Sequence, residues 1–300
     1  MERVMLAENL EISRFVHGYW RLNDWNLGKD QCLNLIKETL AMGITTFDHA
    51  DIYGSYTCEK LFGETLKLEP GLRKEIEIIT KCGIVLKSPN RPLNNGHHYN
   101  TSKSHIIKSA EISLKNFGTD YIDLLLIHRP DPFMDPHEVA EAFSDLKKSG
   151  KVRNFGVSNF LPHQYQMLQS YMDEKLITNQ VEISAWNLEN MENGVLDFAL
   201  EKRIKPMAWS PLGGGYIFKS NEEKALRLRK TLEEIKMELG AKKIDQVMYA
   251  WLLSHPGGII PIIGSGNLGR VELACESIDY KLTRAQWFRI YDASRGREVD

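Results

Sequence analysis

The sequence predicts a single (β/α)8 barrel, the TIM-barrel fold, over residues 1–300. Eight short runs rich in apolar and β-branched residues recur along the chain, and amphipathic stretches of helical period separate them. Such alternation is typical of parallel βαβ units. No Gly-x-Gly-x-x-Gly turn follows the first run, so a closed barrel is favoured over an open, doubly wound sheet.

The predicted strands are short and mostly apolar, as strands buried on both faces are. The run Ile-Asp-Leu-Leu-Leu-Ile, which begins at Ile122, is the clearest example. The eight predicted strands are residues 15–18, 44–49, 76–82, 122–128, 152–158, 178–183, 205–209 and 259–264.

Helical periodicity is strongest in residues 31–42, 103–117, 136–148 and 245–253. Between them, these stretches supply helices that would follow four of the predicted strands.

Four further segments lie outside the eight repeats. Residues 1–13 are expected to form a short hairpin across the bottom of the barrel. Two extra helices, near residues 221–239 and 283–293, are expected to pack outside it. The long polar stretch 86–101 is predicted to be an irregular surface loop above the site.

Composition excludes several functional classes. The chain has 42% hydrophobic and 26% charged residues and a formal net charge of −2, so no strong field attracts nucleic acid or an anionic membrane. Its four cysteines are widely spaced without a CxxC pair, and no apolar run approaches the roughly 18 residues of a membrane span. We expect a cytoplasmic protein with free thiols, no metal site, and no nucleic-acid or membrane partner.

Four reactive side chains fall at the ends of adjacent predicted strands, where barrels of this kind place their active sites. Asp48 ends the second strand, Tyr53 lies in the loop after it, Lys81 ends the third strand and His128 ends the fourth. Each alone has an ordinary explanation, such as a helix cap for the aspartate or a core role for the histidine. Their convergence on one rim favours a shared chemical role.

With these residues, the chain resembles the aldo-keto reductases over nearly its whole length. In that family the catalytic tetrad is an Asp, a Tyr five residues later, a Lys ending strand three and a His ending strand four. Asp48, Tyr53, Lys81 and His128 match it residue by residue. The pattern is also similar to a bacterial branch known chiefly as general oxidoreductases. The resemblance implies an NADPH-dependent monomer that reduces small aldehydes or ketones to alcohols.

The implied chemistry needs these residue types. Hydride reduction of a carbonyl creates an alkoxide that must receive a proton, and Tyr53 would be the general acid. A lysine cation about 4 Å away would lower the tyrosine pKa by on the order of 3 units. Asp48 would keep Lys81 charged, and a neutral His128 would donate a hydrogen bond to the carbonyl oxygen.

The resemblance also implies a cofactor site on the later strands. Ser158, Asn159 and Gln180 would hydrogen-bond the nicotinamide carboxamide, and Trp209 would stack on its ring. The segment after strand seven would line the pyrophosphate with backbone N–H groups, and its residues are Ser210, Pro211, Leu212, Gly213 and Gly214.

The loop after strand eight would hold the adenosine phosphate at a helix N-terminus. The predicted residues there are Gly264, Ser265, Gly266, Asn267 and Arg270. An NADH enzyme usually presents a carboxylate to the ribose, and segment 264–270 has none, so NADPH is predicted. Relatives often follow the arginine with a Glu-Asn pair near the adenine, whereas Leu273 and Ala274 stand here, so no adenine contact is assigned.

Aromatic and charged residues are expected around the substrate. Trp20, after strand one, resembles a pocket aromatic of the family, and Trp186 and Arg129 are further candidates. Aromatics at a barrel rim also serve as structural lids.

Two other functions stay open at this point. Some members of the family act as auxiliary regulatory subunits that bind the nicotinamide and turn over slowly. A barrel enzyme without redox chemistry, acting on a phosphate-bearing substrate, is the second alternative.

Overall fold

The computed structural model describes residues 1–300 and contains a closed barrel of eight strands, as the sequence predicts. Around the barrel the strand order is β10-β11-β12-β3-β4-β5-β8-β9. The strands are β3 (Val16–Gly18), β4 (Thr46–Asp48), β5 (Glu77–Cys82), β8 (Leu124–Ile127), β9 (Phe155–Ser158), β10 (Leu176–Glu182), β11 (Met207–Trp209) and β12 (Ile260–Ile263). All eight fall within the predicted runs or overlap them, which confirms the barrel.

The chain divides into two compact units, and each is described by itself. The first comprises Met1–Asn179 with Gly264–Gly266, and the second comprises Gln180–Ile263 with Asn267–Asp300. The helices of the first unit are α1 (Lys29–Ala41), α2 (Tyr53–Tyr56), α3 (Cys58–Leu66), α4 (Lys103–Phe117), α5 (Pro136–Lys148) and α6 (Pro162–Gln169).

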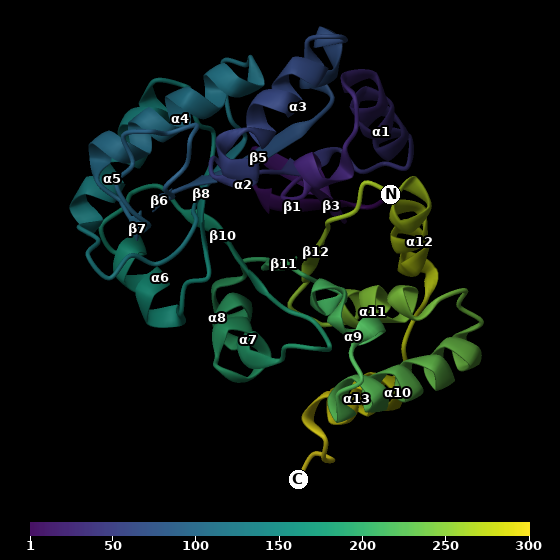
Figure 1. Ribbon diagram of the computed structural model, residues 1–300. Helices are drawn as coiled ribbons and strands as arrows, with labels where there is room; N and C mark the ends of the chain where they lie inside the picture. The colour runs from purple at the N-terminus through teal and green to yellow at the C-terminus, as the bar shows by residue number, and fades with distance from the viewer. The chain divides into compact units, whose positions relative to one another are not determined.

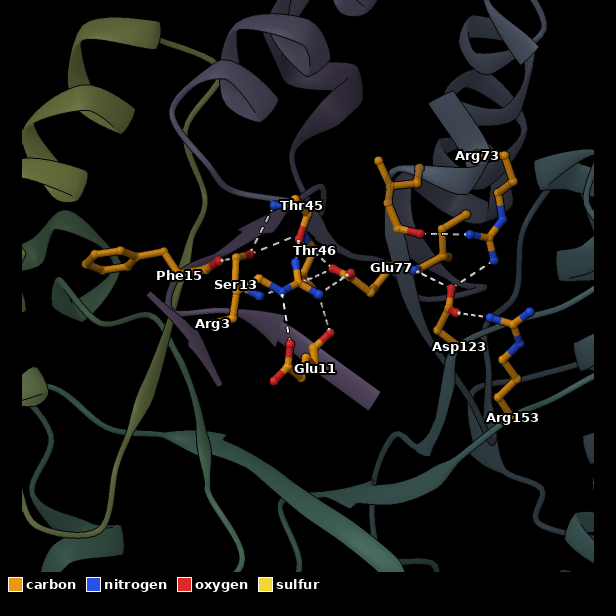
Figure 2. A network of polar contacts seen from close by, with 12 residues as sticks. Arg3, Glu11, Ser13, Phe15, Thr45, Thr46, Arg73, Glu77, Asp123 and Arg153 are labelled. Atoms are coloured by element: carbon orange, nitrogen blue, oxygen red, sulfur yellow. Dashed lines mark hydrogen bonds and ion pairs between the residues drawn. The ribbon is translucent and has the colours of Figure 1, made fainter. Parts of the chain in front are cut away.

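The first unit opens with the predicted hairpin. Strands β1 (Arg3–Ala7) and β2 (Leu10–Ser13) pair antiparallel. The Ser13 hydroxyl accepts hydrogen bonds from the backbone N–H groups of Thr45 and Thr46, at 3.1 and 3.2 Å. Figure 2 shows Ser13 beside these residues, which lie where β4 begins. The hairpin therefore lies at the N-terminal ends of the strands, as expected.

Helices α3 and α4 pack closely against each other in the first unit (Figure 1). A Cβ at Gly63 would lie 2.0 Å from the Asn116 carbonyl oxygen, so the two helices could not approach this far with any other residue there. Aromatic rings of Phe47, Phe62 and Phe117 fill the core beneath them. This packing fixes the helix that follows the Tyr53 loop.

The second unit contains the remaining helices. They are α7 (Glu189–Glu192), α8 (Val195–Lys202), α9 (Tyr216–Lys219), α10 (Glu223–Leu239), α11 (Ile244–Leu253), α12 (Leu268–Glu276) and α13 (Arg284–Arg295). The predicted extra helices are α10 and α13, which lie side by side (Figure 1). Arg289 on α13 forms ion pairs with Glu234 and Glu238 on α10.

Residues 86–101, which are predicted to be an irregular loop, include one strand of a short β pairing. Strands β6 (Ile84–Val85) and β7 (His98–Tyr99) pair antiparallel and close the ends of the loop. A two-residue pairing carries no alternation of apolar and polar residues, so the sequence pattern did not reveal it. None of the helices in the structure combines the length and apolar character needed to cross a membrane.

Candidate active site

The Lys81 ammonium is the centre of a buried polar cluster in the first unit. Lys81 lies near the C-terminal end of strand β5, and its side chain is 1% exposed. The Nζ atom donates hydrogen bonds to both carboxylate oxygens of Asp48, at 2.9 and 2.8 Å, and to the backbone carbonyl of His49 at 2.8 Å. Burial lowers the pKa of Lys81, but the negative charge of Asp48 and the hydrogen bonds to Asp48 and Tyr53 more than offset this, and the pKa is raised. The amine is therefore a cation at neutral pH.

The Tyr53 hydroxyl accepts a hydrogen bond from the same ammonium, at 3.0 Å. A neutral phenol can accept this bond and still donate its own proton. No group of the protein receives that proton, so it remains available for a molecule bound beside it. Three of the four side chains predicted to converge, those of Asp48, Tyr53 and Lys81, are thus joined directly by hydrogen bonds.

The sequence predicts that the pKa of Tyr53 is lowered, and this prediction is wrong for the structure. Burial raises the pKa of Tyr53 above its ordinary value, and the Lys81 cation only partly opposes that rise. Asp48 adds to the rise because its negative charge disfavours a phenolate nearby. The predicted decrease reflects the Lys81 charge alone, whereas desolvation and Asp48 together outweigh that charge in the structure. A phenol with a raised pKa is fully protonated near pH 7, which is the form a general acid needs.

His128 lies beside Tyr53, with ring centroids 5.9 Å apart in an edge-to-face arrangement. Its backbone N–H donates to the Cys82 carbonyl at 2.8 Å, which ties the residue to the end of β5. Burial lowers the pKa of His128 well below its ordinary value, and the charges of Lys81 and Arg129 add to this. The imidazole is therefore neutral, as predicted, and its buried Nδ1 has no partner.

The His49 carbonyl is a contact that sequence reasoning missed. It completes the set of acceptors around the Lys81 ammonium. A backbone carbonyl carries no signature in residue type, so no pattern could have identified it.

A left-handed turn directly after Tyr53 was also not predicted. Gly54, Ser55 and Tyr56 have φ values of 56°, 54° and 72°. Left-handed backbone costs a residue with a side chain about 1–3 kcal/mol, and such strain often marks functional sites. Glycine at position 54 adopts such angles readily, but the residue types Ser55 and Tyr56 do not indicate them.

Five of the expected cofactor residues lie in the first unit. Ser158 ends β9 and is buried, and the Asn159 amide donates to the Ser158 hydroxyl at 2.8 Å and to the His128 carbonyl at 3.2 Å. Asn159 has a φ of 63°, an uncommon value for a residue other than glycine. The other three directly follow β12 and are Gly264, Ser265 and Gly266.

The segment after β12 is held from within the first unit. The Ser265 carbonyl lies 2.8 Å from Nε2 of the buried His17. A Cβ at Gly266 would lie 2.5 Å from the Trp25 ring, so glycine is required for this approach. At Gly264 a Cβ would meet nothing within 4 Å, so the backbone there borders open space.

The second unit holds the remaining cofactor candidates. Gln180 is buried in β10, and Trp209 is the last residue of β11. Ser210 has a φ of 48°, and its carbonyl accepts from the N–H of Gly213 at 2.8 Å. Pro211 and Leu212 lie within this turn, and Gly213 and Gly214 continue the left-handed backbone, with φ values of 59° and 61°.

Helix α12 begins with the predicted phosphate residues. Asn267 is its N-cap, and the side-chain oxygen accepts the N–H of Arg270 at 3.1 Å. The Arg270 guanidinium is exposed on the first turn and has no partner within the protein. A helix N-terminus with an uncommitted guanidinium is suited to a phosphate.

The three substrate candidates are spread over both units. In the first unit, Trp20 is 59% exposed, and the Arg21 guanidinium lies 5.1 Å from its ring centroid. Arg129 directly follows His128 and is partly exposed. In the second unit, Trp186 contacts the Tyr216 ring, with centroids 5.1 Å apart.

Comparisons with known proteins identify the family of this chain. The model of the Aldo/keto reductase family matches residues 14–295. The "Uncharacterized oxidoreductase YcsN" of Bacillus subtilis (strain 168) is 60% identical over 299 residues and covers all of both chains. The "6-dehydroglucose reductase" of Agrobacterium fabrum is 44% identical over 300 residues, again covering both chains fully.

A solved structure supports the same assignment. It is a thermostable aldo-keto reductase in complex with the inhibitor epalrestat. The two chains share 26% identity with a TM-score of 0.81, and the match covers 98% of this chain and 100% of that one. The protein described here therefore belongs to the aldo/keto reductase family.

Proposed function

We propose that the protein is an NADPH-dependent reductase that converts aldehydes or ketones into alcohols, with residues 1–300 acting as one catalytic domain. The proposal rests above all on the Lys81 ammonium, which bonds Asp48 and Tyr53 together and leaves the phenol proton uncommitted. That arrangement suits the delivery of a proton to an oxygen that gains negative charge.

Each of the four side chains has one task in this proposal. Tyr53 donates its proton to the carbonyl oxygen as the oxygen becomes an alkoxide. The Lys81 cation stabilises the phenolate that remains, and Asp48 keeps that cation in place. His128, neutral and adjacent, donates a hydrogen bond that orients the carbonyl. A reduced nicotinamide, when bound, supplies the hydride.

Features of each unit fit such a cofactor. In the first unit, Gly264 borders open space at the end of β12. In the second, a Cβ at Gly214 would also meet nothing within 4 Å, and Arg270 has no partner within the protein. These features leave backbone N–H groups and one guanidinium available for phosphate oxygens.

NADPH is the proposed cofactor because of the charges near α12. No carboxylate lies between Gly264 and Arg270, so nothing in the segment repels a 2′-phosphate. A charge-assisted hydrogen bond contributes about 1.5–3 kcal/mol, which corresponds to a preference of roughly 10- to 150-fold for NADPH over NADH.

The name of the Agrobacterium relative indicates a class of aldehyde to test as substrate. That protein is named for 6-dehydroglucose, a sugar that carries an aldehyde. We propose that this chain acts on a small polyhydroxylated aldehyde of the same kind.

The direct test is steady-state oxidation of NADPH by the purified protein. The panel begins with 6-dehydroglucose and continues with simple aldehydes, ketones and dicarbonyls. Turnover of one of them at several per second supports the enzyme. Tight NADPH binding with turnover slower than about one per minute across the panel would instead favour a regulatory subunit. If the protein bound neither NADPH nor NADH, the enzyme and the regulatory subunit would both be refuted.

Cofactor choice is tested with Arg270→Ala. Arg284→Ala is a matched control, because Arg284 is likewise exposed in the first turn of a helix, α13. We expect Arg270→Ala to weaken NADPH by at least tenfold and to leave NADH nearly unchanged. Equal dissociation constants for the two cofactors in the wild-type protein would contradict the proposed choice.

A further inference from the structure

The left-handed turn Gly54–Ser55–Tyr56 begins one residue after the proposed acid, and side chains from two other loops hold it. We propose that hydrogen bonds clamp this turn from two sides and so position the Tyr53 hydroxyl. Asn23 makes these bonds on one side. On the other side they are made by Asn90 and by the Tyr56 hydroxyl. The inference rests on the proposed function of Tyr53. It assigns a positioning role to residues that touch neither Lys81 nor Asp48.

The first side of the clamp is Asn23, in the loop after β3. Its amide nitrogen donates to the Thr57 hydroxyl at 2.7 Å and to the Gly54 carbonyl at 3.4 Å. The Thr57 hydroxyl in turn donates to the Gly54 carbonyl at 2.6 Å. The fit is close, because a Cβ at Gly54 would lie 2.5 Å from the Asn23 amide nitrogen and 2.6 Å from the Cys58 sulfur.

The second side of the clamp comes from the loop between β6 and β7. The Asn90 amide donates to the Ser55 carbonyl at 2.9 Å, and the Ser88 hydroxyl donates to the same oxygen at 3.4 Å. The Tyr56 hydroxyl accepts from the Leu86 backbone N–H at 2.7 Å. The carbonyls of Gly54 and Ser55 are thus each bonded by a side chain that lies outside the turn.

Packing does not replace these hydrogen bonds. A cavity of about 90 Å³ lies behind the turn, lined by Asp51 and Tyr56, by Arg91 and Asn94 of the loop, and by one face of α4. The buried Asp51 Oδ1 beside it has no partner. With open space on this side, the turn could relax toward ordinary backbone angles if the clamp were removed.

Of Asp48, Tyr53, Lys81 and His128, it is Tyr53 whose position depends on the turn. The Tyr53 carbonyl accepts the Thr57 N–H at 3.1 Å across the turn, so a change in the turn tilts Tyr53. Lys81 and Asp48 lie on barrel strands and are bonded to each other. Loss of the clamp would therefore move the hydroxyl away from a fixed ammonium.

The experiment compares clamp variants with matched controls. Asn90→Ala, Asn23→Ala and Tyr56→Phe each remove one part of the clamp. Asn95→Ala changes an exposed asparagine of the same loop without a hydrogen bond, and Tyr171→Phe removes the hydroxyl of an exposed tyrosine that follows α6. We expect the clamp variants to lower kcat by about 10- to 100-fold, as small misplacements of reacting groups do. NADPH affinity and KM should change less than threefold, and the controls should match the wild type.

A double-mutant cycle separates positioning from a general structural role. The same clamp substitutions are made in Tyr53→Phe, where no hydroxyl remains to be positioned, and residual activity is measured. Positioning predicts no further loss in that background, whereas a structural role predicts the same loss in both. An equal loss in both, or clamp variants that match the controls, would overturn the inference. If Tyr53→Phe itself stays active, the proposed function fails as well.

Discussion

The two ends of strand β5 both lie beside charged side chains that are buried or mostly buried, but these are arranged for different purposes. At the N-terminal end, Glu77 and the neighbouring Asp123 are surrounded by donors that use their oxygens. At the C-terminal end, the Lys81 cluster leaves the Tyr53 proton and the His128 Nδ1 without partners. In such barrels the N-terminal end serves stability and the C-terminal end serves catalysis.

Figure 2 shows the network at the N-terminal end of the strand. The Glu77 carboxylate accepts from Arg3 at 2.7 Å, and from the hydroxyls of Thr45 and Thr46 at 2.6 and 2.7 Å. It thereby joins the hairpin to strands β4 and β5 and has no oxygen left for a ligand.

Asp123, 5% exposed in its side chain, connects the next strand to the same network. Its carboxylate accepts from Arg73 at 2.8 Å, from the Ile78 N–H at 2.9 Å and from Arg153 at 3.3 Å. The comparison teaches that burial of charge alone does not mark an active site. The C-terminal end differs because the Tyr53 proton and the His128 Nδ1 have no partner within the protein.

The largest effect is expected from Lys81→Met, which should lower both the free energy of unfolding and kcat. Removal of the cation leaves Asp48 as a buried carboxylate without its partner, which should cost about 3–5 kcal/mol of unfolding free energy. It also removes the charge that stabilises the phenolate, so kcat should fall by about 10²–10⁴. Denaturant titration and NADPH oxidation measure the two losses. A variant that kept most of its activity would show that the ammonium is purely structural.

Asp123→Ala should affect stability alone. It removes the acceptor of the Ile78 N–H and the carboxylate partner of Arg73, whose guanidinium keeps only neutral acceptors, at a cost of about 3 kcal/mol. The kcat of the folded protein should stay within twofold of the wild type, because this network lies at the other end of the strand. Asp120→Ala, an exposed aspartate nearby, is the control. A large loss of kcat without loss of stability would contradict the division of roles.

Arg153→Ala should have a small effect on the same network. Its side chain is 49% exposed, and its longer contact with Asp123 is partly screened by water. The guanidinium also lies 3.5 Å from the centroid of the Tyr121 ring, which adds a modest cation–π term. We expect a loss of about 0.5–1 kcal/mol in unfolding free energy and no change in kcat. A loss as large as that of Asp123→Ala would mean that Arg153 is its main partner.

The smallest effect is expected from pH near neutrality. Burial raises the pKa of Tyr53 above its ordinary value of about 10, so the acid stays protonated until the pH rises through that value. Burial also lowers the pKa of His128 well below 6.5, so the imidazole stays neutral down to mildly acidic pH. The kcat for reduction should be flat between pH 6.5 and 9 and fall only at higher pH. A transition near pH 7 would show that one of these groups titrates where the structure does not place it.

Much of the fold was predictable because its signals are local. Each barrel strand is a run of apolar residues, and helices such as α4 carry their periodicity in the sequence. Asp48, Lys81 and His128 were predictable because strand ends fix their place in the barrel. The short pairing of β6 with β7 was not, because two residues carry no period.

The parts of the site that escaped prediction depend on distant atoms. The His49 carbonyl and the left-handed angles of Ser55 and Tyr56 are properties of the backbone, and residue type does not record them. The rise in the Tyr53 pKa depends on how much protein surrounds the phenol, which spacing along the chain does not give.

The central claim is that the Tyr53 hydroxyl delivers the proton, and Tyr53→Phe tests it by removing one oxygen. The rate of NADPH oxidation by an aldehyde is measured in a single turnover, beside the dissociation constant for NADPH and the unfolding midpoint. The account predicts a rate about 10²–10⁴ lower, with cofactor affinity within twofold and nearly unchanged stability. A variant that retained more than half of the wild-type rate would contradict it, because another group would then supply the proton.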